Sequence, residues 1–83
     1  MKKLFVGSLP WAINSQALND MFSKFGQVLR ADVVMDRATG RSRGFGFVEM
    51  ANDSEADEAI KQLNGSDMDG RKIVVNEARP REN

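Results

Sequence analysis

The chain has 83 residues, of which 41% are hydrophobic and 29% are charged, and its twelve lysines and arginines balance twelve aspartates and glutamates. That length and balance predict one globular domain that needs no covalent cross-link. With no cysteine and no histidine the chain lacks the usual zinc and iron ligands and an imidazole base, and no apolar run approaches the roughly 20 residues of a membrane-spanning helix.

The first third of the chain predicts a strand followed by a helix. Leu4 and Val6 alternate with Phe5, which is the period of a strand. From Asn14, which suits an N-cap, apolar side chains recur at helical spacing, and Gly26 follows as the expected end of the helix. Near its start the chain has two lysines and then only three apolar residues before Gly7, too short a run for a signal peptide, so we expect the protein to stay in the compartment where it is made.

Two further strands and a turn are expected in the middle of the chain. Residues 28–35 are rich in β-branched side chains, and residues 36–40 have the composition of a turn. Residues 44–50 alternate again. One side of this third strand carries Phe45, Phe47 and Glu49, and the other carries Gly46, Val48 and Met50.

A second helix and a last strand complete the pattern. Residues 52–55 resemble a capping box, and the apolar helical stripe that follows stops at Asn64 and Gly65. Residues 72–78 then alternate as a strand. The order βαββαβ predicts an α+β, ferredoxin-like sandwich, in which two helices cover one face of a four-stranded antiparallel sheet of strand order 4-1-3-2.

Two helices can cover only one face of this sheet, so each strand must offer one set of side chains to the core. The inward set that we predict is aliphatic, and Gly46 within it admits a helix closely. The reverse choice would forfeit roughly 1.5 to 3 kcal/mol for each aliphatic side chain exposed and would bury Glu49 and Asn76. The predicted core is Leu4, Val6, Leu18, Phe22, Val48, Met50, Ala59, Ile60, Ile73 and Val75.

Phe5, Phe45 and Phe47 then point away from the core from two adjacent central strands. A monomer rarely keeps such an apolar patch without a partner. Unpaired bases suit it, because a stacked base contributes on the order of 1 to 3 kcal/mol and the ring needs only the flat face of the base. A dimer seam, or cover by the chain's own tail, is the alternative.

Residues 43–50, RGFGFVEM, match the pattern K/R-G-F/Y-G/A-F-V-x-F/Y at every position except Met50. Residues 4–9, LFVGSL, are similar to the second hexapeptide of the same module. The chain therefore resembles the RNA recognition motif (RRM) family over nearly its whole length, and most of all the small single-domain members of bacteria. The resemblance implies one domain over residues 1–79, with a polar tail over residues 80–83.

The resemblance also implies single-stranded RNA as the partner, with single-stranded DNA bound more weakly. By this resemblance Phe5 and Phe45 each stack a base, Phe47 packs on bases or sugars, and arginines and lysines neutralise phosphate. The expected basic contacts are Lys3, Arg37, Arg41, Arg43, Arg79 and Arg81, and Val34, Asn76 and Ala78 are expected on the same surface. Asp32 and Glu49 on that surface either favour base amino groups or weaken phosphate attraction. Trp11 either closes the edge of the core or extends the stacking surface.

An enzyme is not expected, because the glycines of residues 40–46 fit neither a P-loop nor a Rossmann turn and lead into a strand. A protein-interaction module with the same fold is the alternative, although such relatives usually lose the platform aromatics. The zero net charge argues mildly against nucleic acid, but the charges are segregated along the chain. We expect a monomer with no cofactor, metal or membrane contact, cytoplasmic if bacterial, and nuclear or cytoplasmic if it is a eukaryotic fragment.

Overall fold

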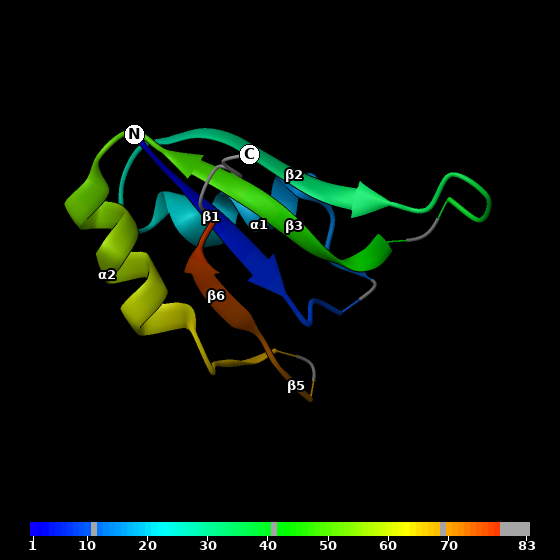
Figure 1. The fold of residues 1–83 in the computed structure, drawn as a ribbon. Coiled ribbons are helices and arrows are strands. Elements are labelled where there is room, and N and C mark those ends of the chain that lie inside the picture. Colours follow the sequence, from blue (N-terminus) through cyan, green and yellow to red (C-terminus); the bar gives the residue numbers. More distant parts are fainter. Residues whose placement is uncertain (11, 41, 69, 79–83) are drawn as a thin grey trace, which may run out of the picture.

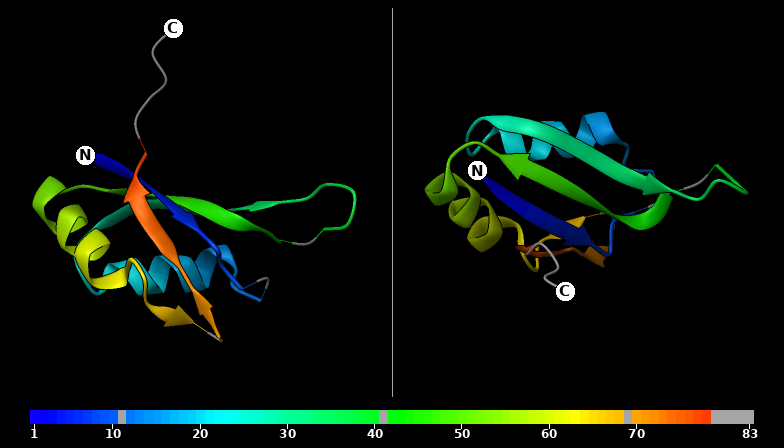
Figure 2. Two further views of the ribbon diagram at one scale, coloured as in Figure 1. Left: turned by 60° about the horizontal axis from the view of Figure 1, so that its bottom comes forward. Right: turned by 45° about the horizontal axis from the view of Figure 1, so that its top comes forward.

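The computed structural model spans residues 1–83 and describes residues 1–10, 12–40, 42–68 and 70–78, without the side chains of Ser42 and Arg43. Both helices lie on one side of a four-stranded sheet (Figures 1 and 2). The elements of the sandwich are β1 (Lys2–Gly7), α1 (Ser15–Ser23), β2 (Val28–Met35), β3 (Ser42–Met50), α2 (Asp53–Leu63) and β6 (Val74–Glu77), and a two-stranded ladder of β4 (Asp67–Met68) and β5 (Arg71–Lys72) precedes β6.

The order of the main sheet is β2-β3-β1-β6, and all of its neighbouring strands are antiparallel. Since β6 is the fourth strand of the main sheet, this is the predicted order 4-1-3-2 of a ferredoxin-like fold. Helix α1 packs against β2 and β3, and α2 packs against β1, β3 and β6. The other face of the sheet, which we call the open face, carries no helix (Figure 1).

The core confirms the predicted choice of face. All of the predicted inward side chains are fully buried except Ile60, which is partly buried against the others. Gly46 is needed at its place on β3, because a Cβ there would collide with the main-chain oxygen of Asp32 on β2. It would also lie 3.2 Å from Leu18 Cδ2 on α1. The close approach is therefore mainly to a neighbouring strand, and only secondly to the helix that we predicted.

Helix α1 begins as expected, because Asn14 Oδ1 accepts a hydrogen bond from Ala17 N at 2.8 Å. It ends earlier than expected. Phe25 N donates to Phe22 O, which tightens the chain after Ser23, and Gly26 lies beyond the end of the helix. Gly26 leaves room instead for the Glu55 carboxylate, which a Cβ at that position would meet.

The prediction of a single strand over residues 72–78 is wrong at its start. Lys72 pairs with Asp67 in the small β4–β5 ladder. The backbone of Ile73 is hydrogen-bonded to the preceding turn and not to β1. Its carbonyl oxygen accepts from Gly65 N at 2.8 Å, and its N–H donates to Ser66 O at 3.0 Å. Pairing with β1 starts only at Val74, although the Ile73 side chain is still buried in the core.

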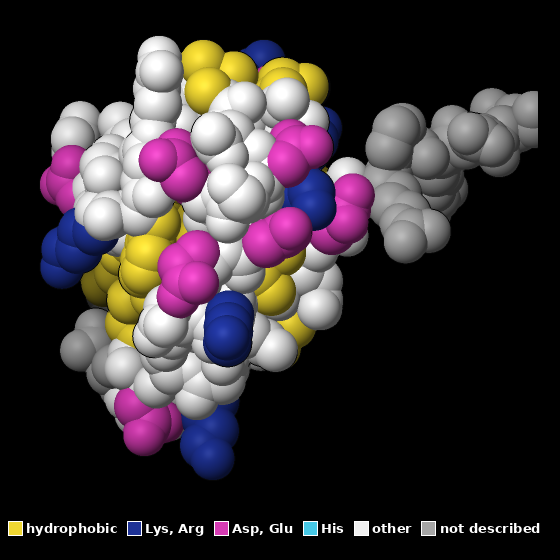
Figure 3. All heavy atoms as spheres, turned by 90° about the vertical axis from the view of Figure 1, so that its left-hand side faces the viewer, with side chains coloured by type: hydrophobic (Ala, Val, Ile, Leu, Met, Phe, Trp, Pro, Cys, Tyr) yellow, Lys and Arg dark blue, Asp and Glu magenta, His cyan; other side chains and the backbone are white. Residues whose placement is uncertain are grey.

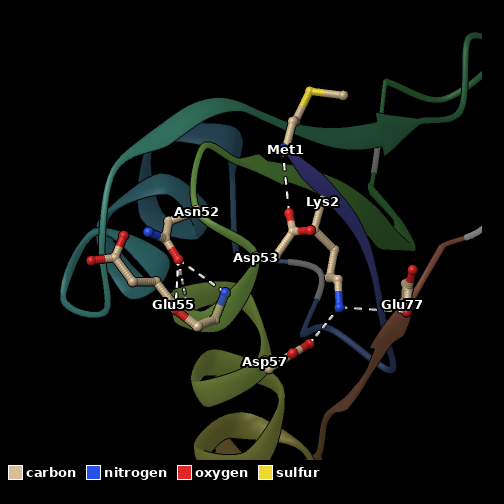
Figure 4. A network of polar contacts seen from close by, with 8 residues as sticks. Met1, Lys2, Asn52, Asp53, Glu55, Asp57 and Glu77 are labelled. Carbon is tan, nitrogen blue, oxygen red and sulfur yellow. Dashed lines mark hydrogen bonds and ion pairs between the residues drawn. The ribbon is translucent and has the colours of Figure 1, made fainter.

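A polar network ties β1 to α2 and β6 at the end of the sheet where the chain starts (Figure 4). Lys2 Nζ lies 2.6 Å from Asp57 Oδ1 on α2 and 3.7 Å from Glu77 Oε1 on β6. The hydrogen bond that Lys2 donates to Asp57 raises the pKa of Lys2 above its ordinary value, partial burial opposes that rise, and the charges of Asp57, Glu77 and Asp53 add to it. The amino group of Met1 lies 3.3 Å from Asp53 Oδ1.

Candidate functional site

Three phenylalanine rings meet at the centre of the open face, and we call them the aromatic platform. Phe5 on β1 is paired directly with Phe47 on β3, and Phe45 is the next residue along β3 on the same face. The ring centroids are 5.9 Å apart for Phe5 and Phe45, 5.8 Å for Phe5 and Phe47, and 6.3 Å for Phe45 and Phe47. These separations are typical of interacting aromatic pairs, and each ring remains partly exposed to solvent.

Two glycines of the sequence motifs shape this platform. A Cβ at Gly7 would lie 2.8 Å from Cε2 of the Phe5 ring, so glycine lets that ring lie back along β1. Gly44, directly before Phe45, has a φ of +84°, a conformation that side-chain-bearing residues rarely adopt. The RGFGF segment therefore bends β3 just where Phe45 joins the platform.

Charged side chains surround Phe47 on the open face. Lys3 Nζ lies 4.9 Å from the centroid of the Phe47 ring, within cation–π range. Glu49 is paired across the sheet with Lys3 on one side and Arg30 on the other, and Asp32 is paired with Phe47. The Arg30 guanidinium forms an ion pair with Asp32.

Sequence reasoning did not single out Arg30. The sequence could have indicated it, because Arg30 precedes Asp32 by two residues in a strand and residues at that spacing lie on the same face of the sheet. Among the described residues, two cations, Lys3 and Arg30, and two carboxylates, Asp32 and Glu49, thus lie on the strand segments around Phe47.

The other predicted site residues are spread around the platform. Asn76 on β6 is exposed and paired with Phe5, so it lies at the side of the platform away from β3. Ala78 follows β6, and its N–H donates to Lys3 O at 2.8 Å. Val34 on β2 is partly buried.

Arg37 is exposed in the turn between β2 and β3, which extends past the end of the sheet (Figure 1). That turn is held by Asp36, whose main-chain oxygen accepts from Gly40 N at 2.7 Å. Arg37 is therefore placed at the rim and not against the rings. Trp11, Arg41, Arg79, Arg81 and the side chain of Arg43 lie outside the described residues.

Negative charge gathers on the helical side of the molecule. Asp53, Asp57 and Glu58 are exposed on α2, and acidic side chains are prominent on the side where α2 lies (Figure 3). The zero net charge of the whole chain therefore hides an uneven distribution, with exposed carboxylates gathered on α2.

Within residues 1–10, 12–40, 42–68 and 70–78, no group of three or more acidic, histidine or cysteine side chains could hold a metal ion. No helix in the same part of the chain is long and apolar enough to cross a membrane.

Comparison with known proteins gives a consistent result. The model of a family described as RNA recognition motif matches residues 4–74. A glycine-rich RNA-binding protein of Hordeum vulgare is 52% identical over 79 residues, which cover 95% of this chain and 49% of that protein. This chain thus spans about half the length of that protein and of similar glycine-rich RNA-binding proteins of Sinapis alba and Sorghum bicolor.

Solved structures agree in both fold and sequence. The RNA-binding protein PG1 matches with a TM-score of 0.92 and 40% identity over 100% of both chains. An Sxl-lethal protein/RNA complex matches with a TM-score of 0.87 and 34% identity, over 93% of this chain and 47% of that one. At these identities the likeness extends beyond the fold.

Proposed function

Because the chain belongs to the RNA recognition motif family, we propose that it binds single-stranded RNA on the open face of its sheet. The observation that carries this proposal is the aromatic platform, three partly exposed rings with centroids no more than 6.3 Å apart. Rings in this arrangement offer flat apolar surface to bases that are not stacked in a duplex. A duplex would hide those faces, so single strands are the ligand that fits.

Electrostatic attraction supports this binding from the rim. Arg37 lies in the exposed turn beside the open face, and Lys3 lies at the start of β1. Contacts of such cations with phosphate weaken as salt rises, because releasing the counterions condensed on the RNA gains less free energy in a more concentrated salt solution. Two or three stacked bases and a few phosphate contacts, less the cost of ordering the strand, give roughly micromolar affinity. Single-stranded DNA lacks the 2′-hydroxyl and binds more weakly.

The double variant Phe45→Ala/Phe47→Ala tests the proposal. We expect it to weaken binding of short fluorescent RNAs of mixed sequence by at least about 30-fold, since each stacked base contributes about 1 to 3 kcal/mol. Titrations by fluorescence anisotropy measure this loss, and circular dichroism checks that the variant is folded.

Phe25→Ala is the matched control, because Phe25 packs partly against the core on the helical side of the sheet. We expect this variant to keep its RNA affinity unchanged. Unchanged binding by the folded double variant would place the RNA site elsewhere. Failure of the wild-type chain to bind any RNA in the pool would overturn the proposal in favour of a protein partner.

A further inference from the structure

Resting on the proposed function, we propose that Lys3 and Glu49 select guanine at the base that stacks on Phe47. The proposal concerns one corner of the open face, where a donor and an acceptor lie beside one ring. Lys3 and Glu49 are directly paired across β1 and β3, and Phe47 precedes Glu49 by two residues on the same face of β3. All three side chains therefore border the same surface.

The Glu49 carboxylate is the acceptor that remains available at this corner. Asp32, the other carboxylate near Phe47, is engaged by the guanidinium of Arg30. Among the described residues no hydrogen bond or ion pair joins Glu49 to another side chain. Glu49 is also partly buried, and a hydrogen bond to a charged acceptor gains strength where water is partly excluded.

Lys3 is the matching donor. Its ammonium lies 4.9 Å from the Phe47 ring centroid, and the side chain is exposed. A base that stacks on Phe47 displaces the ammonium from the ring towards the edge of the base. The long, flexible stem of lysine permits that movement at little cost.

The hydrogen-bond donors and acceptors of the four bases then decide which base fits Lys3 and Glu49. The Watson–Crick edge of guanine presents N1–H and N2–H side by side, which fits the two oxygens of one carboxylate, with O6 beside them as an acceptor for the ammonium. Uracil offers a single N–H between two carbonyl oxygens, one of which would face the carboxylate. Adenine and cytosine offer one amino group next to an unprotonated ring nitrogen. Only guanine satisfies Glu49 with two bonds and Lys3 with one.

Heptamer RNAs that differ only at their central base test this assignment. We expect UUUGUUU to bind the wild-type chain about tenfold more tightly than the heptamer of uridine alone, from two charge-assisted hydrogen bonds partly offset by desolvation. Heptamers with central adenine or cytosine should lie near the uridine one. Central inosine lacks the N2 amino group and should lose about half of the logarithmic gain.

Glu49→Gln provides the decisive variant. Its amide offers one acceptor oxygen in place of two and no charge, so the preference for guanine should fall to about twofold or less. Glu58→Gln makes the same chemical change on α2, on the opposite side of the sheet, and should keep the full preference.

The outcomes separate this inference from the proposed function. If Glu49→Gln strengthens binding to all heptamers equally, the carboxylate only repels phosphate and the inference is wrong. It is also wrong if the wild-type chain binds all heptamers alike while Phe45→Ala/Phe47→Ala still abolishes binding, and the RNA-binding function then stands. Absence of wild-type binding to every heptamer would instead remove the function on which the inference rests.

Discussion

Gly46 has no side chain at the place where β3 passes closest to its neighbours. A Cβ there would collide with the Asp32 main-chain oxygen and lie 3.1 Å from Val33 Cα and 3.2 Å from Leu18 Cδ2. Two of these neighbours are backbone atoms, which cannot rotate away. We expect Gly46→Ala to lower the free energy of unfolding by about 2 to 3 kcal/mol, as overpacked core substitutions do.

Urea denaturation of Gly46→Ala measures this loss, and Gly40→Ala is the informative control. A Cβ at Gly40 meets nothing within 4 Å, but the backbone there has a φ of +70°. Its cost should be only the backbone strain of about 1 kcal/mol. Equal losses in the two variants would contradict a steric role for Gly46.

The position of a single side chain was predictable where alternation along a strand decides which face of the sheet that side chain occupies. The period of two in β1 and β3 placed Phe5, Phe45 and Phe47 together on the open face, because the reverse assignment would have exposed the aliphatic side chains and buried polar ones. Alternation places Arg30 and Asp32 on one face of the sheet, but it does not fix the side-chain rotamers that bring the two into an ion pair. The sequence also does not show that Gly7 leaves room for the Phe5 ring, because that depends on where the ring lies in the folded protein.

Helix α2 is held at its start by Asn52. Its Oδ1 accepts from Ser54 N at 2.9 Å and from Glu55 N at 3.3 Å (Figure 4). Asp53 and Glu55 in the first turn and Lys61 in the last also oppose the helix dipole favourably. We expect Asn52→Ala to lower the free energy of unfolding by about 1 kcal/mol, measured by urea denaturation.

Asn52→Ser keeps a side-chain acceptor at the N-cap and should retain most of that stability. RNA affinity should not change in either variant, because α2 lies on the opposite side of the sheet from the aromatic platform (Figure 1). If serine destabilises as much as alanine, capping is not what Asn52 contributes.

The helices and strands were predicted where local chemistry sets their limits. Both N-caps, Asn14 and Asn52, act as the sequence indicated. The predicted end of α1 was wrong, because Gly26 was interpreted as the residue that stops the helix. In the structure Gly26 leaves room for the side chain of Glu55 on α2. The predicted start of the last strand was wrong for a related reason. The apolar alternation continues through Ile73, but its backbone hydrogen bonds go to residues 65 and 66.

The network at Lys2 makes the stability of the whole domain depend on pH at the alkaline end. Its hydrogen bond with Asp57 raises the pKa of Lys2, and Lys2 joins β1 to α2 and β6. A folded-state pKa above the unfolded value of about 10.4 stabilises the fold fully below that pH. The stabilisation is lost as the pH rises through the folded-state pKa.

Urea denaturation of wild type and Lys2→Met across this range tests the effect. The difference in their free energies of unfolding should be constant from about pH 7 to pH 9 and should shrink above about pH 10.4. In an Asp57→Asn background most of that pH dependence should disappear, because Asp57 is the main cause of the shift. A difference that stays constant above that pH would show that Lys2 contributes through packing of its stem alone.

Strand β1 is central, and its two partners come from distant parts of the chain. It pairs with β3, where Leu4 meets Val48, and with β6, where Leu4 meets Glu77. During synthesis β1 leaves the ribosome before either partner, and its second edge stays open until residues 74–77 have emerged. The domain therefore completes its sheet only after residues 74–77 have emerged, so a nascent chain stalled before β6 presents an unpaired central strand to chaperones and to other nascent chains.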